Sequence, residues 1–344
     1  MTEARPVLAV TMGDPAGIGP EIAVRALLSP EVRECSRSFL IGDARVFDRA
    51  LSVCGLSASL HRIAGPEMIA DRVGVIDVMH QDTVDPDALQ IGKVQALGGE
   101  AAYAAIRTSI ELAMAGRIAG VATTPINKES LKAANIPFIG HTEMFAEHTG
   151  AREEMTMFTI SGLKIFFLTR HLSLVEACRQ ITRERTLSGI EKAMKALHQL
   201  GIDAPHLAVA ALNPHGGEDG LFGREEIDAI KPAIEAARAR GMHVSGPVPA
   251  DSVFHMARIG RYDAVLSLYH DQGHIAAKMM DFEKTVSVTL GLPILRTSVD
   301  HGTAFDIAGT GRASAVSMIE AIKVAAEYAV RGVRLGDNVA QAAE

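Results

Sequence analysis

The chain has 344 residues, a formal net charge of −7 and 48% hydrophobic residues. This length predicts about two domains with a sizeable buried core, and the composition is ordinary for a soluble globular protein. The acidic balance, the absence of Trp and the 4% aromatic content argue against nucleic acid as a partner.

The cysteines and the amino-terminal residues indicate the cellular compartment in which the protein is expected. Cys35, Cys54 and Cys178 are widely spaced and form no CxxC pair, which predicts a reducing environment and no disulfide framework. Residues 1–6 contain no apolar signal core, and no apolar run is long enough to span a membrane. We therefore expect a cytoplasmic protein with no membrane partner.

Strand and helix patterns alternate along the chain. Residues 7–11 are typical of a buried strand, and a glycine-rich turn at residues 12–20 leads into a helix that begins near Glu21. This turn is not the GxGxxG dinucleotide fingerprint. Further strands are predicted at residues 38–42, 73–78, 118–122, 155–160, 164–169, 206–212, 263–268 and 290–295, and further helices at residues 44–53, 93–115, 182–199 and 224–240.

The pattern predicts two α/β domains. No internal repeat or flexible linker interrupts the chain, so one domain is expected to be inserted in the other. The predicted first domain comprises residues 1–128 and 300–344, and the inserted domain comprises residues 129–299.

Three histidines follow the ends of apolar strands. His171, His215 and His270 each enter a polar or glycine-rich segment, and the carboxyl ends of strands are where open α/β folds bind ligands. Three imidazoles at equivalent places predict a metal site with a position left for water or substrate. The alternative is solvated strand ends with incidental histidines. His274 is a candidate supporting residue.

Other polar residues suggest an anion site. Lys278 and Arg296 would hold a phosphate or carboxylate, or would belong to internal salt bridges. His141 and Thr142 begin a predicted helix, where an anion also binds favourably; the alternative is a simple helix start.

Several motifs carry a resemblance to known families. The segment His301-Gly-Thr-Ala-Phe-Asp-Ile-Ala-Gly-Thr-Gly311 is similar to the nucleotide-binding segment of the isocitrate and isopropylmalate dehydrogenases, and Gly13 to Glu21 resembles a turn near their amino termini. Together with the segments 140–143, 213–218, 269–273 and 296–304, these motifs resemble the 4-hydroxythreonine-4-phosphate dehydrogenase family. That family includes a branch acting on 4-phospho-D-threonate or 4-phospho-D-erythronate. The likeness extends from about residue 7 to residue 330.

The resemblance implies an architecture and a set of site residues. It implies an isocitrate/isopropylmalate dehydrogenase-like α/β fold with an interdomain cleft. It also implies a homodimer with shared active sites, in which the inserted domain of each subunit carries metal ligands and dimer contacts. It implies NAD or NADP and one divalent metal (Zn, Mg, Co or Mn). The implied metal ligands are His171, His215 and, from the partner subunit, His270; the substrate residues are His141, Thr142, Lys278, Ser287 and Arg296; the cofactor residues are His301, Gly302, Thr303, Ala304, Asp306 and Gly309.

The expected reaction is oxidation of a phosphorylated 3-hydroxy acid followed by decarboxylation. The leading substrate is 4-phosphooxy-L-threonine, an intermediate of pyridoxal phosphate biosynthesis, and the alternative is 4-phospho-D-threonate or 4-phospho-D-erythronate. Asp251 and His141 are the candidate bases, and Lys278 a further candidate catalytic residue. Ser287 stands where the family usually has Asn, and it lacks the paired donor and acceptor of an amide. A metal-dependent hydrolase and a metal-stabilised binding protein are the rival interpretations.

Overall fold

The computed structural model describes residues 5–332, which form two compact units. The first unit combines residues 1–154 with residues 292–344, and the second comprises Met155–Gly291. The elements of the first unit are β1 (Val7–Thr11), α1 (Gly19–Leu28), α2 (Pro30–Cys35), β2 (Arg37–Gly42), α3 (Ala44–Val53), β3 (Ser59–Arg62), η1 (Pro66–Met68), β4 (Val75–His80), α4 (Ala96–Met114), β5 (Gly120–Thr123), α5 (Lys128–Ala133), α6 (His141–Thr149), β12 (Arg296–Val299) and α12 (Val316–Val330). Those of the second are β6 (Met155–Ile160), β7 (Leu163–Phe167), α7 (Leu174–Arg179), α8 (Arg183–Gln199), β8 (Leu207–Ala210), the turn η2 (Pro214–Gly220), the π-helical turn η3 (Glu226–Ile230), α9 (Lys231–Ala239), β9 (Val244–Val248), α10 (Ala250–Arg258), β10 (Ala264–Ser267), α11 (His270–Met280) and β11 (Val286–Leu290).

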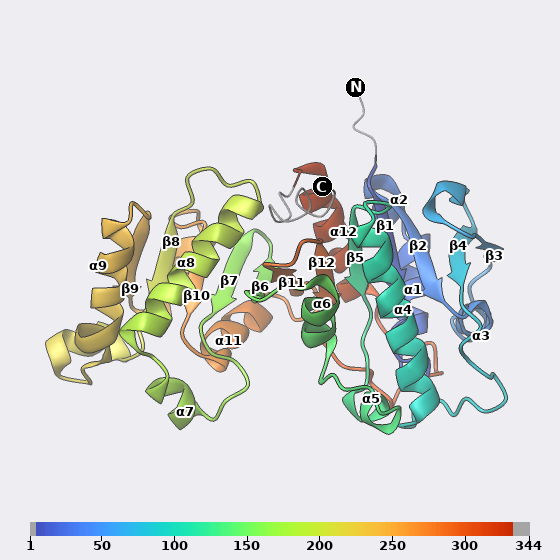
Figure 1. Ribbon diagram of the computed structural model, residues 1–344, viewed down its shortest axis with the longest axis horizontal. Helices are drawn as coiled ribbons and strands as arrows, with labels where there is room; N and C mark the ends of the chain where they lie inside the picture. Colours follow the sequence, from blue (N-terminus) through green and yellow to red (C-terminus); the bar gives the residue numbers. More distant parts are fainter. Residues whose placement is uncertain (1–4, 333–344) are drawn as a thin grey trace. The chain divides into compact units, whose positions relative to one another are not determined.

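The first unit is built on a parallel sheet. Its strand order is β3-β4-β2-β1-β5-β12, and every pairing in this run is parallel. Helix α4 packs on one face with α5 and α6, whereas α1 packs with α2, α3 and α12 (Figure 1). Because both faces are covered, the central strands are apolar throughout, and Leu8, Ala9 and Val10 are all fully buried.

The second unit has a mixed sheet in the order β11-β6-β7-β10-β8-β9. The predicted hairpin is confirmed: β6 and β7 pair antiparallel around Ser161 and Gly162, whose positive φ angles of 46° and 86° match a tight hairpin turn. From β7 onward the strands are parallel, so the ends of β7, β10 and β8 lie next to one another along one edge. These three strands precede His171, His270 and His215.

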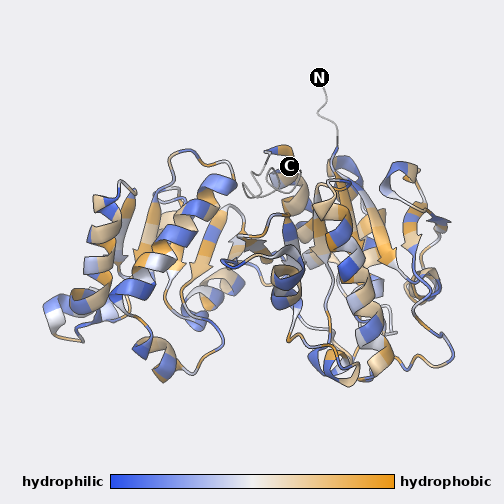
Figure 2. Cartoon of the chain, viewed as in Figure 1, coloured by the Kyte–Doolittle hydropathy of each residue, from blue (hydrophilic) through white to orange (hydrophobic). Residues whose placement is uncertain are grey.

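Helices cover the second sheet as well. Helix α8 packs with α9 and contacts β8 and β10, while α10 and α11 pack on a core that includes Phe158, Phe167 and Val265. Figure 2 shows the strands mostly in hydrophobic colours and much of the outer surface of α8 in hydrophilic colours. None of the helices between residues 5 and 332 combines the length and apolarity of a membrane span. All three cysteines are free.

Some predicted elements differ from the observed ones. The predicted strand at 290–295 is wrong, because β11 ends at Leu290, residues 291–294 form bends and the next strand begins at Arg296. The predicted helix at 224–240 is divided into η3 and α9. Strands β3, β9 and β11 are absent from the prediction. The observed unit boundaries fall at 154/155 and 291/292, since α5 and α6 pack with α4, and β12 pairs with β5.

Candidate functional site

The glycine-rich turn and the segment 301–311 form one structure in the first unit. The amide of Ile18 donates a hydrogen bond to the carbonyl of Thr303 at 3.0 Å. A Cβ atom on Gly17 would lie 2.8 Å from Cβ of Thr303, so only glycine permits this approach. Two stretches almost 300 residues apart in the chain thus form a single double loop.

A buried carboxylate supports this double loop. Glu21 is 3% exposed, and its two oxygens accept hydrogen bonds from the amides of Gly309 (2.6 Å) and Gly311 (2.9 Å). Arg25 donates to the carbonyl of Gly311 at 2.8 Å. Both glycines have positive φ angles, 77° and 70°, so the carboxylate stabilises a conformation that other residues rarely adopt.

The predicted cofactor residues all lie in this double loop. Thr303 is buried and anchors it, whereas Gly302, Asp306 and Gly309 are exposed. A Cβ atom on Gly302 would meet no atom within 4 Å, so its backbone is open to a ligand. The remaining predicted residues are His301, whose Nδ1 lies 3.0 Å from the carbonyl oxygen of Gly302, and Ala304, with a positive φ of 41°.

Arg296 and His141 form the polar centre of the other candidate region in this unit. Arg296 is 4% exposed; its guanidinium donates to Oγ1 of Thr123 at 2.9 Å and lies 5.4 Å from the ring centroid of Phe145. Phe145 is one helical turn after His141 on α6. Thr142 follows His141 and is half-buried. The structure therefore brings together two predicted substrate residues that are 155 positions apart.

His141 is held in its neutral form. Burial, and then the positive charge of Arg296, keep the pKa of His141 well below its usual value. Its Nε2 atom is buried and has no hydrogen-bond partner among the described residues. A neutral imidazole with an unsatisfied nitrogen can accept a proton or hydrogen-bond a ligand.

In the second unit His270 and His171 are neighbours. Their ring centroids are 6.1 Å apart. Nδ1 of His270 lies 2.6 Å from Oδ1 of Asp271, which leaves Nε2 as the nitrogen available to a ligand. His274, one turn along α11, stacks on His270 with a centroid distance of 3.6 Å and an interplanar angle of 11°.

His215 lies in an unusual loop. Residues 215–219 all have positive φ angles, between 42° and 81°, and three of the five are not glycine. Glu226, 1% exposed, holds the start of this loop: its Oε1 accepts from the amides of Leu212 (2.8 Å) and Asn213 (2.7 Å), and its Oε2 accepts from the side-chain amide of Asn213 (2.8 Å). The hydrogen bonds offset the cost of both the buried charge and the left-handed backbone.

The donor set of the histidine pair fits a divalent cation. Two imidazoles bound tetrahedrally to one cation, each nitrogen about 2.1 Å from it, have ring centroids about 5.3 Å apart. The rings of His171 and His270 are somewhat farther apart, at 6.1 Å, and Asp271 orients one ring in the manner of a metal ligand. Within residues 5–332 of one chain, no three His, Cys, Asp or Glu side chains converge as a metal-binding group, so His215 does not join the pair.

The remaining predicted residues lie on α10, α11 and β11. Asp251, in the first turn of α10, lines an open hollow of about 550 Å³ together with Tyr269 and Asp271, a volume within the range of small-molecule sites. Burial, with smaller effects from Cys178 and Asp271, raises the pKa of Tyr269. Lys278 Nζ lies 5.0 Å from the ring centroid of Phe282. Ser287 is half-buried on β11, opposite Phe158.

Sequence reasoning missed the residues that support these side chains. Glu21, Glu226, Thr123 and Asp271 are polar groups beside the predicted site residues. Two of them carry a signal that could have identified them: Asp271 is adjacent to His270, and Glu21 ends the motif that begins at Gly13. Glu226 and Thr123 act across distances that depend on the strand order.

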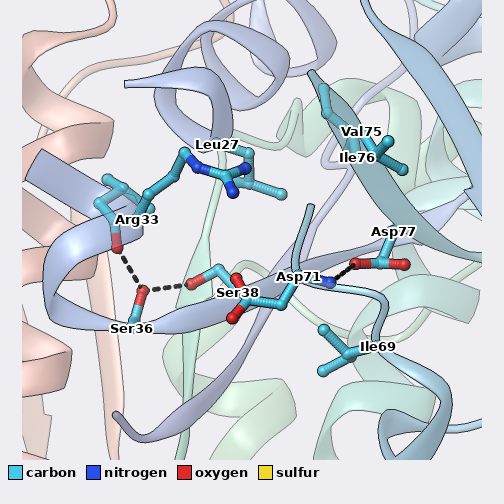
Figure 3. Close-up of a pocket in the computed structure, with 10 residues that line it drawn as sticks. Leu27, Arg33, Ser36, Ser38, Ile69, Asp71, Val75, Ile76 and Asp77 are labelled. Atoms are coloured by element: carbon cyan, nitrogen blue, oxygen red, sulfur yellow. Dashed lines mark hydrogen bonds between the residues drawn. The ribbon is translucent and has the colours of Figure 1, made fainter. Parts of the chain in front are cut away.

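A small cavity in the first unit lies at the end of its sheet opposite to the double loop. It is at the amino ends of β2 and β4, has a volume of about 20 Å³, and is lined by residues that include Arg33, Asp71 and Asp77 (Figure 3). Its polar groups bond to one another, as Ser36 and Ser38 do at 2.8 Å. The cavity has room for about one water molecule, so we assign it no ligand.

Comparison with known proteins gives consistent results. The family model described as "Pyridoxal phosphate biosynthetic protein PdxA" matches residues 34–325. A protein of Symbiobacterium thermophilum named "Putative D-threonate 4-phosphate dehydrogenase" is 59% identical over 327 residues, which are 95% of this chain and 98% of that protein. A protein of the same name from Clostridium botulinum (strain Langeland) is 52% identical over 328 residues, covering 95% and 98% of the two chains.

Solved structures are similar in fold along most of the chain. The 4-hydroxythreonine-4-phosphate dehydrogenase of Klebsiella pneumoniae matches with a TM-score of 0.88 and 40% identity, covering 94% of this chain and 99% of that one. The enzyme of the same name from Burkholderia phymatum matches with a TM-score of 0.84 and 40% identity, covering 95% and 99%. These similarities confirm the predicted α/β fold class.

The lowered pKa of His141 predicts a pH effect on stability. Below about pH 6.5 the unfolded chain binds a proton at His141 that the folded chain does not bind, so acidification destabilises the native state. Replacing His141 by Gln removes this contribution. Between pH 7.5 and 5.5, wild type should lose about 1 kcal/mol more unfolding free energy than His141→Gln, measured by urea denaturation. The control is His198→Gln on the surface of α8; equal losses in wild type and His141→Gln would contradict the prediction.

Proposed function

Because the chain belongs to the PdxA family, we propose that it is an NAD(P)-dependent dehydrogenase that oxidises a phosphorylated 3-hydroxy acid and decarboxylates the resulting β-keto acid. The observation that carries the proposal is the pairing, within one unit, of a buried Arg296 with a neutral His141. A buried guanidinium suits an anionic substrate, and a neutral imidazole beside it suits transfer of the hydroxyl proton.

The substrate we favour is 4-phospho-D-threonate. Relatives that carry the threonate name are 59% and 52% identical to this chain, whereas the hydroxythreonine enzymes of known structure are 40% identical. This difference favours the alternative substrate over 4-phosphooxy-L-threonine, the expected leading one. The two substrates share the phosphate and differ at C2, which carries a hydroxyl in one and an amino group in the other. Ser287, in place of the family's usual Asn, is a residue that could distinguish them.

The chain's own residues bind and orient this substrate. Arg296, with its guanidinium fixed by Thr123 and Phe145, holds the carboxylate or phosphate, and Lys278 and Thr142 supply further donors. His141 is the base we propose for the hydroxyl proton, because its pKa is low enough for it to remain unprotonated at neutral pH. Asp251, which lines the hollow beside α11, is the alternative base.

We propose that the cofactor and the metal use the loops described above. The double loop of residues 301–311 holds NAD or NADP, with His301, Gly302, Thr303, Ala304, Asp306 and Gly309 as the contacting residues. His171, His215 and His270 hold one divalent cation, of which Zn, Mg, Co and Mn are the candidates. When bound, the nicotinamide accepts hydride and the cation stabilises negative charge on the substrate oxygen.

The proposal includes a homodimer with shared active sites. Helix α11 and the segment after it expose Ile275 (62%), Met279 (81%) and Phe282 (62%), and α7 exposes Leu174 and Val175 at 60% and 61%. Apolar side chains exposed to this extent on neighbouring positions are typical of an interface. A partner subunit that covers them would bring its own histidines close to these helices. A cytoplasmic location is consistent with three free cysteines.

The rival function is a metal-dependent hydrolase, which would use the same histidines to activate water. A hydrolase would have no ligand for the double loop at residues 301–311 to bind. Calorimetric titration with NAD and with NADP separates the two functions, because a hydrolase has no reason to bind either dinucleotide.

Removal of a proposed metal ligand should abolish metal binding. Replacing His171, His215 or His270 singly by Ala should reduce bound divalent metal below one tenth per chain and lower kcat/KM by more than about 100-fold, while far-UV circular dichroism stays unchanged. Metal content is measured by elemental analysis of the purified protein. His198→Ala, at an exposed position on α8, is the matched control. Full metal content in any of the three variants would remove that histidine from the site.

Shared active sites predict complementation between inactive variants. If His270 acts in the neighbouring subunit's site, mixing His171→Ala and His270→Ala subunits should restore activity, because some sites in the mixed dimer then contain all the histidines. We expect roughly a quarter to a half of wild-type activity after subunit exchange verified by mass spectrometry. No recovery of activity would indicate that each site takes both His171 and His270 from a single chain. The 6.1 Å between the two ring centroids in one chain is compatible with that outcome.

The choice of substrate is tested at Ser287. Wild type should turn over 4-phospho-D-threonate faster than 4-phosphooxy-L-threonine, with NADH or NADPH and CO₂ both released. Ser287→Asn should shift the ratio of kcat/KM between the two substrates by about 2- to 10-fold toward the amino compound, because Asn adds a hydrogen-bonding amide near C2.

A control within the same experiment is the dissociation constant for the dinucleotide, which should remain unchanged because the double loop is elsewhere. Equal effects of Ser287→Asn on both substrates would identify Ser287 as a packing residue. Absence of turnover of both compounds would refute the proposed substrate class.

A further inference from the structure

The end of strand β5 contacts both candidate regions of the first unit. Oγ1 of Thr123, the last residue of the strand, accepts a hydrogen bond from the guanidinium of Arg296 at 2.9 Å. The next residue, Thr124, donates from its Oγ1 to the carbonyl of Thr11 at 2.9 Å, directly before the glycine-rich turn of residues 12–20. Two adjacent side chains therefore connect the proposed anion site with this turn.

The glycine-rich turn closes around the side chain of Thr124. A Cβ atom on Gly13 would lie 2.3 Å from Oγ1 of Thr124, and a Cβ atom on Gly19 would lie 3.1 Å from the same oxygen. Both glycines thus allow the backbone to approach a hydroxyl group that a side chain at either position would crowd. The amide of Asp14 also donates to the carbonyl of Pro125 at 3.0 Å, so the turn is bound to the backbone of the same segment.

The connection continues from the turn to the open backbone of the double loop. The amide of Ile18, in the turn, donates to the carbonyl of Thr303 at 3.0 Å. Thr303 follows Gly302, whose backbone is open to a ligand. Every contact between Arg296 and this backbone lies within the first unit, so the connection is independent of the subunit that supplies the histidines.

The side chains in this connection are buried. Thr11, Thr123 and Thr124 are 0% exposed, and Thr303 is 7% exposed. A buried hydroxyl group is stable only when it is hydrogen-bonded, and closely packed neighbours shift little to accommodate a changed one. The hydroxyl of Thr124 therefore fixes the place of the turn that surrounds it.

We propose that Thr124 is a positioning residue that fixes the double loop relative to the guanidinium of Arg296. The inference rests on the proposed function, in which Arg296 holds an anionic group of the substrate and the double loop holds the dinucleotide. Hydride transfer requires reacting atoms roughly 3–3.5 Å apart, and a misplacement of about 1 Å can lower the rate about 100-fold. Thr124 contacts neither ligand, and its effect passes through the glycine-rich turn.

Three variants test the role of this hydroxyl group. Thr124→Val has nearly the same shape, but its methyl group cannot donate to Thr11 and is larger than the hydroxyl beside the two glycines. Thr124→Ser keeps the hydroxyl. Thr297→Val is the matched control, because Thr297 is equally buried on the neighbouring strand β12 but donates to the carbonyl of Ala321 on α12, at 2.8 Å.

Amide hydrogen exchange of the ligand-free protein is the first readout. Thr124→Val should raise exchange about 5- to 10-fold in residues 12–20 and 301–305, whereas Thr124→Ser should match wild type and Thr297→Val should raise exchange in α12 alone. Unchanged exchange in residues 12–20 of Thr124→Val would overturn the proposal. An equal rise throughout the first unit would also overturn it, since that outcome indicates general destabilisation.

Kinetics with 4-phospho-D-threonate provide the second readout. With the dinucleotide that wild type binds, Thr124→Val should lower kcat about 10- to 100-fold, because each ligand still binds but the two are misplaced relative to each other. The KM of the substrate and the calorimetric dissociation constant of the dinucleotide should change by less than about threefold. Thr124→Ser should restore kcat, and Thr297→Val should keep it within about twofold of wild type. Equal losses in Thr124→Val and Thr297→Val, or no recovery with Thr124→Ser, would contradict the positioning role.

A second variant covers the case in which Thr124→Val does not fold, as judged by far-UV circular dichroism. Thr124→Ala removes the same hydroxyl group without adding bulk, and the same outcomes apply to it.

The proposed function fails separately from this inference. If wild type binds neither NAD nor NADP and turns over neither substrate, the proposed function is refuted, and the exchange data still decide whether Thr124 fixes the turn. If wild type is active and Thr124→Val has the kcat of wild type, the positioning role is refuted and the proposed function stands.

Discussion

Two buried glutamates hold the loops on which the candidate chemistry depends. Glu21 and Glu226 are 3% and 1% exposed. Glu21 accepts hydrogen bonds from the amides of Gly309 and Gly311, and Glu226 accepts them from the amides of Leu212 and Asn213, just before the left-handed stretch. A buried carboxylate is costly unless its lone pairs are satisfied, and a buried amide without a partner is costly as well. Each glutamate therefore stabilises its loop, and each loop makes the burial of its glutamate possible.

This arrangement divides the tasks between helices and loops. The rigid elements, α1 in the first unit and η3 in the second, carry the carboxylates, while the loops present His215 and the exposed backbone of Gly302 and Gly309. A loop whose backbone is held by buried hydrogen bonds can expose functional groups without being mobile. The same logic applies to Arg296, whose contacts with Thr123 and Phe145 hold its guanidinium beside His141.

Much of the fold could be predicted because its signals are local. Apolar runs identified β1, β2 and the hairpin of β6 and β7, and the positions of His171, His215 and His270 after strands followed from the same pattern. The apolar run from Leu290 to Leu295 predicts a strand that ends before Arg296. In the structure Arg296 begins a strand instead, because Gly291 and Pro293 interrupt the ladder.

The supporting contacts could not be predicted because they are not local. Thr124 reaches Thr11 only because β1 and β5 are neighbours in the sheet, although 113 positions separate the two residues in the chain. The buried environment of His141 likewise depends on a residue 155 positions away. Sequence motifs thus identified the residues that present functional groups, and the structure identifies the residues that hold them.

Because the first unit is built from two separate stretches of the chain, it can be completed only after the second unit has been synthesised. Strand β12 pairs with β5, and Thr123 donates from its Oγ1 to the carbonyl of Thr297, 174 positions later. The parallel sheet of the first unit therefore lacks β12 until residues 296–299 have left the ribosome. The second unit is continuous, from Met155 to Gly291, and has all its strands before β12 is made. A chain that stops short of Arg296 would contain every proposed metal ligand and still lack the guanidinium beside His141, so truncated products would retain the histidines without the anion site.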